Sequence, residues 1–323
     1  MIAPTERHAL FNRWQRGFPL VARPFEALGH GCGLGGDEVL QALREGLAQG
    51  EISRVGAVFG VGAGGAGLLC AMQVPAGRMD EVAACVNGEP AVNHNYAREH
   101  AWNLWFVVTA RDRASVQACV SRIEAATGLV AMRLPMRRAY RIDLGFDLFQ
   151  RAGAMPGMRP AEPVEPELRP LAARLEAGVP LVERPWALLG APLGMPEDRV
   201  LQALQAWCAR GTVRRMGVVL RHHEFGIAAN AMTVFSLPAE QVDAAGERLA
   251  RQPGVTLCYR REPAPGWPYA LYCMVHGRER QAVRRVIAEA VTGAGLGACE
   301  HQVLFSTRRF KQTGSRYFAD SMQ

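Results

Sequence analysis

The sequence consists of two related halves in tandem. The hexapeptide PLVARP at residues 19–24 recurs as PLVERP at residues 180–185, a displacement of 161 positions. Two further blocks align at this displacement without a gap: residues 39–43 with 200–204, and residues 54–58 with 215–219. Self-similarity on this scale indicates a duplicated structural unit. We therefore expect two copies of one fold that pack against each other as a covalent pseudo-dimer.

Six segments are expected along the chain. A stretch rich in proline and glutamate, residues 152–170, separates the two copies and is typical of a stiff, exposed linker. The expected segments are a first winged helix-turn-helix at 1–60, a first ferredoxin-like domain at 61–150, the linker at 151–169, a second winged helix-turn-helix at 170–220, a second ferredoxin-like domain at 221–311 and a tail at 312–323.

Each copy begins with a pattern that predicts three helices followed by a β-segment. Val39, Leu40, Leu43 and Leu47 recur at helical spacing. The helices are expected near residues 5–17, after 24 and at 37–48 in the first copy, and near 167–177, after 185 and at 196–209 in the second. The β-segments are expected at 52–59 and 212–220. Three helices and a β-wing indicate a winged helix-turn-helix.

The rest of each copy predicts the order β-α-β-β-α-β, which is that of a ferredoxin-like split βαβ domain. The strands are expected near 68–74, 92–98, 103–109 and 131–142, and again near 228–237, 255–262, 269–276 and 302–310. The fold class is therefore α+β, a tandem repeat of winged helix-turn-helix plus ferredoxin-like βαββαβ domain. Helices cover only one face of such a sheet, so we expect the other face to meet the second copy; further association into a homo-oligomer is left open.

Composition restricts the setting of the protein. The N-terminus has no apolar core of signal-peptide length, and no apolar run approaches the ~18–20 residues that cross a bilayer. We expect a cytoplasmic protein without membrane contact. The eight cysteines include no C-x-x-C pair, so neither a disulfide framework nor a zinc site is predicted. A net charge of +7 favours an anionic partner without separating nucleic acid from a carboxylate or phosphate ligand.

The stretch from residue 92 to residue 108 is the strongest candidate for a binding site. His94, Tyr96, Arg98 and His100 are spaced by two, so on a strand they can share one face. Burying four polar groups without a partner is costly. The pattern therefore predicts a cavity that holds a flat, anionic molecule.

The two copies have diverged in complementary ways at this site. Tyr96 and Arg98 correspond to Tyr259 and Arg261, but His94 corresponds to Leu257. Conversely, the second copy carries histidines at 222 and 223 where the first has valine and glycine at 61 and 62. Two equal sites would not need unlike residues. We therefore expect one working pocket that is built by both copies.

Several distinctive motifs occur along the chain: PLV-x-RP in both copies, HNYAREHAWNLWF from residue 94, CYRR from residue 258, GWPYALY from residue 266, and LRHHEFGIAANAM from residue 220. These motifs resemble those of the sirohaem decarboxylases, which share the fold of the leucine-responsive (Lrp/AsnC) transcription regulators. The resemblance covers residues 8–310 and is to the fused form of these enzymes. It implies removal of the acetate carboxyls at C12 and C18 of sirohaem to give 12,18-didecarboxysirohaem, by acid-assisted chemistry without a redox step. That product precedes haem d1, or haem in an alternative route.

The chemistry of this reaction and the divergence of the two copies suggest residue roles. Catalytic roles fall to His94, His222, Arg98 and Tyr96, with His94 or His222 as proton donor or as axial ligand to the iron. The iron belongs to the substrate, so no separate metal site and no further cofactor are expected. The expected substrate-binding residues are Arg221, Arg260, Arg261, Tyr259, Trp105, Trp267, Arg54, Arg215 and His223. Because residues alternate along a strand, only one of His222 and His223 is expected to face inward.

Each assignment has an alternative. Trp105 and Trp267 are equally consistent with a hydrophobic core, and Arg54 and Arg215 with surface salt bridges. The chain as a whole could be an Lrp/AsnC-like DNA-binding regulator, or a tetrapyrrole sensor or carrier without turnover. DNA binding is disfavoured because the candidate recognition helices begin with acidic residues at 37–38 and 197–198, where phosphates would approach.

Overall fold

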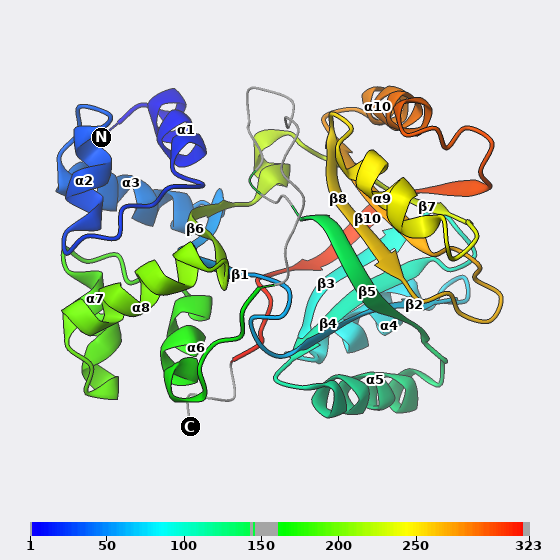
Figure 1. The fold of residues 1–323 in the computed structure, drawn as a ribbon, viewed down its shortest axis with the longest axis horizontal. Coiled ribbons are helices and arrows are strands. Elements are labelled where there is room, and N and C mark those ends of the chain that lie inside the picture. The colour runs from blue at the N-terminus through cyan, green and yellow to red at the C-terminus, as the bar shows by residue number, and fades with distance from the viewer. Residues whose placement is uncertain (1, 143–144, 146–160, 319–323) are drawn as a thin grey trace.

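The computed structural model describes residues 2–142, 145 and 161–318, with the side chain of His222 outside this description. A helical half and a β-barrel half lie side by side, with strands β1 and β6 between them (Figure 1). Residues 151–160 of the expected linker lie outside the described residues. The part that follows is attached to the first copy at two buried residues, because the backbone N–H groups of Ala161 and Val164 donate to the carbonyls of Val61 and Ala63, whereas Glu162 and Pro163 are exposed as predicted.

The helical half contains the first helices of both copies. In the first copy they are α1 (Pro4–Arg13), α2 (Pro24–His30) and α3 (Gly36–Ala48). In the second copy they are η1 (Pro166–Leu168), α6 (Arg169–Ala177), α7 (Pro185–Gly190), η2 (Ala191–Leu193) and α8 (Glu197–Ala209). Proline occupies the first turn of α1, α2, α6 and α7, where its missing N–H costs nothing.

The β-segments of the two copies pair with each other. Strand β1 (Ile52–Phe59) runs antiparallel to β6 (Val213–Leu220), so a single ribbon serves both helix-turn-helix units rather than a wing within each copy. The N-terminal helices cross over to this ribbon, because α1 contacts β6 and α6 contacts β1. A Cβ atom at Gly217 would lie 2.3 Å from the carbonyl oxygen of Trp14, so only glycine permits this close crossing.

The barrel half contains two βαββαβ units. The first consists of β2 (Ala66–Met72), α4 (Met79–Gly88), β3 (Val92–Arg98), β4 (Leu104–Ala110), α5 (Arg113–Thr127) and β5 (Met132–Ile142). The second follows the short helix η3 (His222–Phe225) and consists of β7 (Ala229–Phe235), α9 (Val242–Ala250), β8 (Val255–Arg261), β9 (Leu271–Gly277), α10 (Arg280–Gly293) and β10 (His301–Gln312). The predicted α+β tandem repeat is confirmed.

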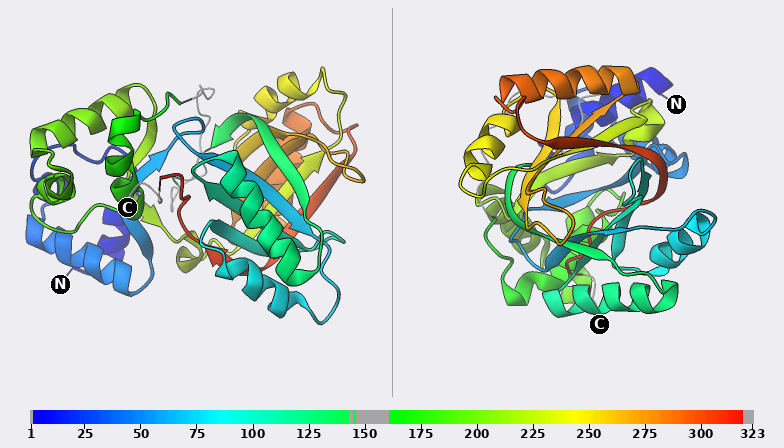
Figure 2. Two further views of the ribbon diagram at one scale, coloured as in Figure 1. Left: turned by 90° about the horizontal axis from the view of Figure 1, so that it is seen from below. Right: turned by 90° about the vertical axis from the view of Figure 1, so that its right-hand side faces the viewer.

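The two units merge into one closed barrel in the order β10-β3-β4-β2-β5-β8-β9-β7, counted over the described residues. Two long strands make the closure: β10 pairs with both β7 and β3, and β5 pairs with both β2 and β8. The helices lie on the outside of the barrel (Figure 2). The free faces of the two sheets therefore meet, as predicted, and together enclose the barrel interior.

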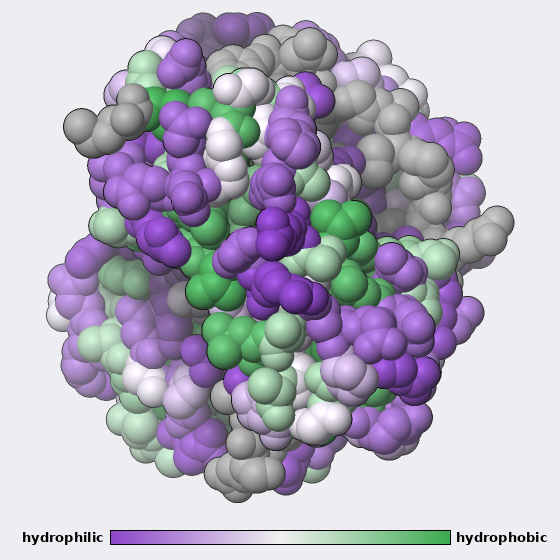
Figure 3. Space-filling view, turned by 90° about the vertical axis from the view of Figure 1, so that its left-hand side faces the viewer, coloured by the Kyte–Doolittle hydropathy of each residue, from purple (hydrophilic) through white to green (hydrophobic). Residues whose placement is uncertain are grey.

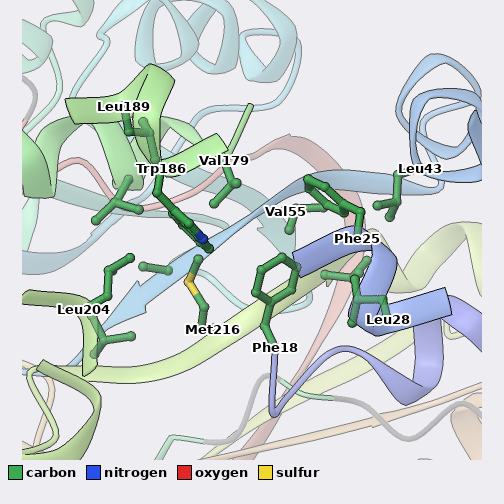
Figure 4. Packing of buried hydrophobic residues seen from close by; sticks show 14 of the residues in the cluster. Phe18, Phe25, Leu28, Leu43, Val55, Val179, Trp186, Leu189, Leu204 and Met216 are labelled. Atoms are coloured by element: carbon green, nitrogen blue, oxygen red, sulfur yellow. The ribbon is translucent and has the colours of Figure 1, made fainter. Parts of the chain in front are cut away.

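The helical half and the barrel half have separate hydrophobic cores. In the helical half, side chains of both copies share one core, in which Phe18, Phe25, Trp186 and Leu204 pack together (Figure 4). Trp186 is fully buried and donates its indole N–H to the carbonyl of Val21 at 2.7 Å. Truncating one such aromatic side chain typically costs ~3–5 kcal/mol. This shared core fixes the ribbon relative to the helices of both copies.

No helix within residues 2–142 and 161–318 is long and apolar enough to cross a membrane. In the same residues, no group of three or more histidine, cysteine, aspartate and glutamate side chains could hold a metal ion.

Candidate active site

A cleft lies between the ribbon and the end of the barrel at which β3 begins and β10 ends. The space within it is about 800 Å³, a figure that includes the solvent at its open mouth. Both copies line it: Ser53, Arg54, Ala57, Val58, Phe59 and His94 come from the first, and Glu176, Arg215, Val219, Leu220, Arg221, Gln312, Thr313, Gly314, Ser315 and Tyr317 come from the second. Four of the predicted site residues, His94, Arg54, Arg215 and Arg221, therefore meet here.

His94 faces the cleft from the barrel. Its Nδ1 atom lies 2.6 Å from Oδ1 of the preceding residue, Asn93. The Asn93 amide is itself oriented, because its Nδ2 donates to Oγ1 of Thr109 at 2.9 Å. With Oδ1 as the acceptor, Nδ1 of His94 carries the proton, and Nε2 keeps its lone pair.

Burial determines the charge of His94. Desolvation lowers its pKa to about 4, so the imidazole is neutral near pH 7. A neutral imidazole with a free Nε2 lone pair suits metal ligation, and its second nitrogen is held by an outer partner in the usual way. The same state is a poor proton donor. Of the two predicted roles for His94, the geometry therefore favours the iron ligand.

Two arginines face the cleft from the ribbon. Arg54 lies opposite Val219, and Arg215 lies opposite Val58, so the two guanidinium groups occupy equivalent positions on one face. Arg54 Nη2 donates to the carbonyl of Ala57 at 3.2 Å, and its Nε has no hydrogen-bond partner among the described residues. Its burial lowers its pKa, yet an arginine remains charged near neutrality. With Arg221, these groups place three cations in the cleft against one acidic side chain, Glu176, which suits the cleft to carboxylates.

A column of polar side chains continues from His94 into the barrel. The His94 and Tyr96 rings are stacked at 6.2 Å, and the Arg98 guanidinium lies 5.7 Å from the Tyr96 ring. On the opposite side of the interior, the Arg261 guanidinium lies 5.2 Å from the Tyr259 ring. The sequence prediction of one shared face is thus confirmed for residues 94, 96 and 98, whereas His100 follows the end of β3 at Arg98 and its ring lies 5.3 Å from that of Trp267.

The two barrel arginines have little compensation for their charge. Arg98 Nη1 donates to the Leu304 carbonyl at 2.9 Å, and Arg261 Nη1 donates to the Leu134 carbonyl at 2.8 Å. No acidic side chain pairs with either one in the residues that the structure describes, and both Nε atoms lack a partner there. Burial lowers the pKa of Arg98 to about 10 and lowers that of Arg261. Uncompensated buried cations are costly, which favours a role in binding anions.

Arg260 does not join the site. It precedes the inward-facing Arg261, so it points to the outer face of β8, where Nη1 forms an ion pair with Oδ1 of Asp243 at 3.1 Å. Strand alternation alone excludes both arginines from sharing one face. The expectation that Arg260 clamps a substrate carboxylate is therefore wrong for this structure.

Trp105 and Trp267 belong to the barrel core rather than to the cleft wall. Their rings lie 5.4 Å apart, and they are only 2% and 1% exposed. Both indole N–H groups are satisfied internally, Trp105 by the Trp102 carbonyl at 2.7 Å and Trp267 by the Tyr272 hydroxyl at 2.7 Å. These two tryptophans therefore belong to the hydrophobic core, which was the alternative to a role in substrate binding.

The histidine pair at 222 and 223 lies in the short helix η3 rather than on a strand. Strand alternation therefore cannot decide between them, and this part of the prediction fails. His223 is half-buried, and burial and the nearby charge of Arg309 lower its pKa. The side chain of His222 lies outside the described residues, so its predicted role stays a prediction.

Sequence reasoning missed two polar residues on β10. Arg309 lies opposite Tyr96 and Gln312 lies opposite His94, and Arg309 Nη1 donates to Gln312 Oε1 at 3.2 Å. The equivalent partners in the other half of the barrel are Ala139 opposite Tyr259 and Ile142 opposite Leu257. At these equivalent positions the cross-strand pairs are polar in one copy's half of the barrel and lack a second polar partner in the other. A comparison of the copies beyond the hairpin would have found this asymmetry.

Glu176 was also missed. Its carboxylate accepts the backbone N–H of Tyr317 at 2.7 Å and that of Phe318 at 3.1 Å. Burial outweighs these hydrogen bonds and the attraction of Arg54, and it raises the pKa of Glu176 to about 7. At the displacement of 161 positions, the first copy has Gln15, so this difference between the copies was readable in the sequence.

Two models of known protein families match this sequence. A family model described as "AsnC-like ligand binding domain" matches residues 63–141 and 224–311. A model described as "Siroheme decarboxylase NirDL-like HTH domain" matches residues 7–52 and 170–214. Both models therefore match twice, once in each copy.

Individual proteins similar to this chain are also sirohaem decarboxylase subunits. The sirohaem decarboxylase NirDL subunit of Paracoccus denitrificans (strain Pd 1222) is 43% identical over 309 residues, which is 95% of each chain. The sirohaem decarboxylase NirL subunit of Stutzerimonas stutzeri is 49% identical over 144 residues, 44% of this chain and 85% of its own length.

Solved structures of sirohaem decarboxylase NirDL have the same architecture. One matches with a TM-score of 0.69 and 26% identity, covering 98% of this chain and 96% of its own. Another, in co-complex with an iron-uroporphyrin III analogue, matches with a TM-score of 0.68 and 26% identity, again covering 98% and 96% of the two chains. The chain therefore belongs to the sirohaem decarboxylase NirDL family, with its helix-turn-helix and AsnC-like ligand-binding domains each present twice.

Proposed function

We propose that this chain is a sirohaem decarboxylase whose substrate binds in the cleft between the ribbon and the barrel. The observation that carries the proposal is the meeting of His94 from the first copy with Arg215 and Arg221 from the second in a single cleft. An iron tetrapyrrole with several carboxylates needs one ligand for its metal and several cations for its rim. Family membership and the NirDL complex with an iron-uroporphyrin analogue support the same assignment.

The proposed reaction converts the acetates at C12 and C18 into methyl groups. For each acetate, the bond between the carboxyl carbon and the methylene carbon breaks, and CO2 leaves without the electron pair. The macrocycle delocalises that pair, and a proton then adds to the methylene carbon. Electrons are neither gained nor lost overall, so the protein needs to supply orientation and protons only.

The residue roles follow from charge and geometry. Arg54, Arg215 and Arg221 bind carboxylates at the rim, since a guanidinium fork matches a carboxylate in two-point fashion. His94 ligates the iron through Nε2, and Tyr96 and Arg98 lie behind it in the barrel. The Tyr96 hydroxyl, whose pKa burial raises to about 12, stays protonated and can donate a hydrogen bond. His222 is retained as the proton donor, one of the two roles predicted for it from the sequence.

The direct test is anaerobic incubation of the purified chain with sirohaem, followed by mass spectrometry of the extracted tetrapyrrole. We expect a product that has lost two CO2 molecules, and fragmentation or NMR then places the new methyl groups at C12 and C18. Spectral binding without any change in mass would instead indicate a sensor or carrier. The absence of both binding and turnover would refute the proposal.

The helix-turn-helix units are less suited to DNA. The first turns of α3 and α8 carry Asp37, Glu38, Glu197 and Asp198, and Arg44 on α3 donates to the Leu181 carbonyl of the other copy. Hydrophobic side chains lie among the hydrophilic ones on the face of the helical half (Figure 3). A duplex-binding face instead needs a run of cations that neutralises phosphates.

We further propose that the product feeds haem d1 synthesis, because the fused arrangement matches relatives such as the NirDL subunit of Paracoccus denitrificans. Deletion of the gene in its host, followed by extraction of the tetrapyrroles, distinguishes the two end products: loss of haem d1 with haem retained would support the proposal, and loss of haem would contradict it. Other relatives are separate subunits, such as NirL of Stutzerimonas stutzeri. Size measurement by light scattering tests whether this fused chain associates further.

A further inference from the structure

The C-terminal segment at residues 313–318, here called the strap, leaves the barrel after β10 and crosses to the helical half. At the barrel end, the Thr313 N–H donates to the Asn93 carbonyl at 2.8 Å. At the other end, the Phe318 side chain is fully buried in the helical core, with its ring 4.9 Å from that of Phe59. The strap therefore connects the two walls of the cleft, and Thr313, Gly314, Ser315 and Tyr317 line it.

Glu176 holds the strap at the helical end. Both carboxylate oxygens are used, since Oε1 accepts from the Tyr317 N–H and Oε2 accepts from the Phe318 N–H. Hydrogen bonds to a carboxylate are about twice as strong as neutral ones. In the first copy, the equivalent Gln15 serves a local contact instead, because its Nε2 donates to Asn12 Oδ1 at 3.1 Å.

The strap also reaches the partners of His94. The Arg316 N–H donates to Thr109 Oγ1 at 2.9 Å. The same oxygen accepts from Asn93 Nδ2, and Asn93 Oδ1 faces His94 Nδ1. A continuous series of contacts thus leads from Glu176, through the strap and Thr109, to the imidazole.

We propose that Glu176 is a positioning residue for the decarboxylation: its carboxylate holds the strap so that Thr109 and Asn93 orient His94 toward the substrate iron. The effect of Glu176 on catalysis rests on the proposed function. Its hydrogen bonds to the strap do not depend on that function. Arg54 on β1, and Arg316 and Tyr317 on the strap, are the charged and titratable groups that face the carboxylate. Arg54 further links the strap to the cleft, because a Cβ atom at Gly314 would lie 2.6 Å from Arg54 Nη1.

The test compares Glu176→Gln with Glu165→Gln. Glu165 is a matched control in the same half, because it accepts from the Trp207 indole N–H at 2.9 Å and pairs with Arg210, yet it does not line the cleft. Hydrogen exchange of the C-terminal peptide, measured without substrate, reports the strap directly. We expect the Tyr317 and Phe318 amides to exchange about tenfold faster in Glu176→Gln and unchanged in Glu165→Gln.

The second readout is the spectrum of the sirohaem complex, which reports the ligation of the iron. We expect Glu176→Gln to move it toward the spectrum of His94→Ala and to weaken binding by no more than about tenfold, the lower limit for loss of a direct outer partner of a metal ligand. Thr109→Val, which removes the hydroxyl in the middle of the series, is expected to shift the spectrum in the same direction. Glu165→Gln should keep the wild-type spectrum even if its stability falls.

Three outcomes would overturn the proposal: unchanged exchange in Glu176→Gln, faster exchange with an unaltered complex, or the same spectral shift in Glu165→Gln. Failure of the wild-type chain to bind sirohaem would refute the proposed function instead. The exchange measurement would still decide whether Glu176 holds the strap.

Discussion

Asn93 Oδ1 and His94 Nδ1, on adjacent residues of one strand, lie 2.6 Å apart. Neighbouring side chains of a strand normally point to opposite faces, and β3 has an irregularity in its pairing with β4 between Val92 and His94. This short contact assigns the proton to Nδ1 and leaves Nε2 as a ligand. The proposed role of His94 as the iron ligand depends on this contact.

We predict that Asn93→Ala reduces decarboxylation by about 10–100-fold, the usual effect of removing an outer partner of a metal ligand. The imidazole would lose the acceptor that fixes its tautomer and ring orientation. The measurement is turnover together with the absorption spectrum of the sirohaem complex. Wild-type turnover in the variant would show that the contact has no role in orienting His94.

The second prediction concerns stability of the substrate-free protein against pH. Because burial lowers the pKa of His94 to about 4, the folded protein binds fewer protons than the unfolded chain between that pH and about 6.5. This group's contribution is therefore complete above about pH 6.5 and is lost as the pH falls toward 4. His94→Gln should lack a pH-dependent contribution of about 2–3 kcal/mol.

Denaturant titrations of the wild type and His94→Gln at several pH values give this difference directly. Parallel stability curves between pH 4 and pH 6.5 would mean that His94 is not desolvated in the folded chain.

Replacing Arg98 with methionine should separate function from stability. The buried guanidinium has no acidic partner in the described residues, so an apolar side chain of similar length removes a desolvation cost. We expect the free energy of unfolding to stay equal or to rise by about 1 kcal/mol, while sirohaem turnover is lost. A large loss of stability would instead show that Arg98 is mainly structural.

Arg260 and Arg261 are adjacent, which provides a control within one strand. Arg260→Ala breaks a partly exposed ion pair with Asp243, so we expect at most about 1 kcal/mol of destabilisation and unchanged turnover. Arg261→Met should lower turnover because its guanidinium lies inside the barrel. Kinetic assays of the two variants side by side check this, and an equal effect of both would contradict the assigned strand faces.

Gly314→Val should affect the cleft through Arg54. The added side chain would meet Nη1 of Arg54, whose flexible end can move aside without disturbing the backbone. We therefore expect weaker sirohaem binding with nearly unchanged melting temperature. A titration that gives the wild-type dissociation constant would show that the observed position of Arg54 is not needed for binding.

Most of the fold could be predicted because the chain repeats. Strands β1 and β3 begin and end at the expected residues, Ile52–Phe59 and Val92–Arg98, since each has a strong apolar or alternating pattern. The pairing of β1 with β6 could not be predicted. Periodicity reports which residues form a strand, but not which edge of the other copy completes it.

The site was predictable only in part. The unlike residues His94 and Leu257 pointed to β3 rather than β8 as the strand that faces the cleft, and strand alternation placed Arg98 on the same face as His94. Glu176 and Arg309 were missed because neither lies in a motif, and because their roles come from contacts between segments far apart in the sequence. Arg260 was misassigned because two adjacent arginines were considered together, although a strand separates them onto opposite faces.

Closure of the barrel by strands of both copies has a consequence for how the sequences of the two copies can diverge. In the described ring every strand is paired on both sides, so it presents no open edge on which another copy could add. Two free chains of equal mutual affinity would pair at random, and only about half of the pairs would combine unlike partners. Joining them in one polypeptide raises their effective concentration to the millimolar range. Every molecule then contains one copy with His94 and one copy with Arg215 and Arg221, so the one-to-one ratio of the two copies is encoded in the gene rather than left to assembly.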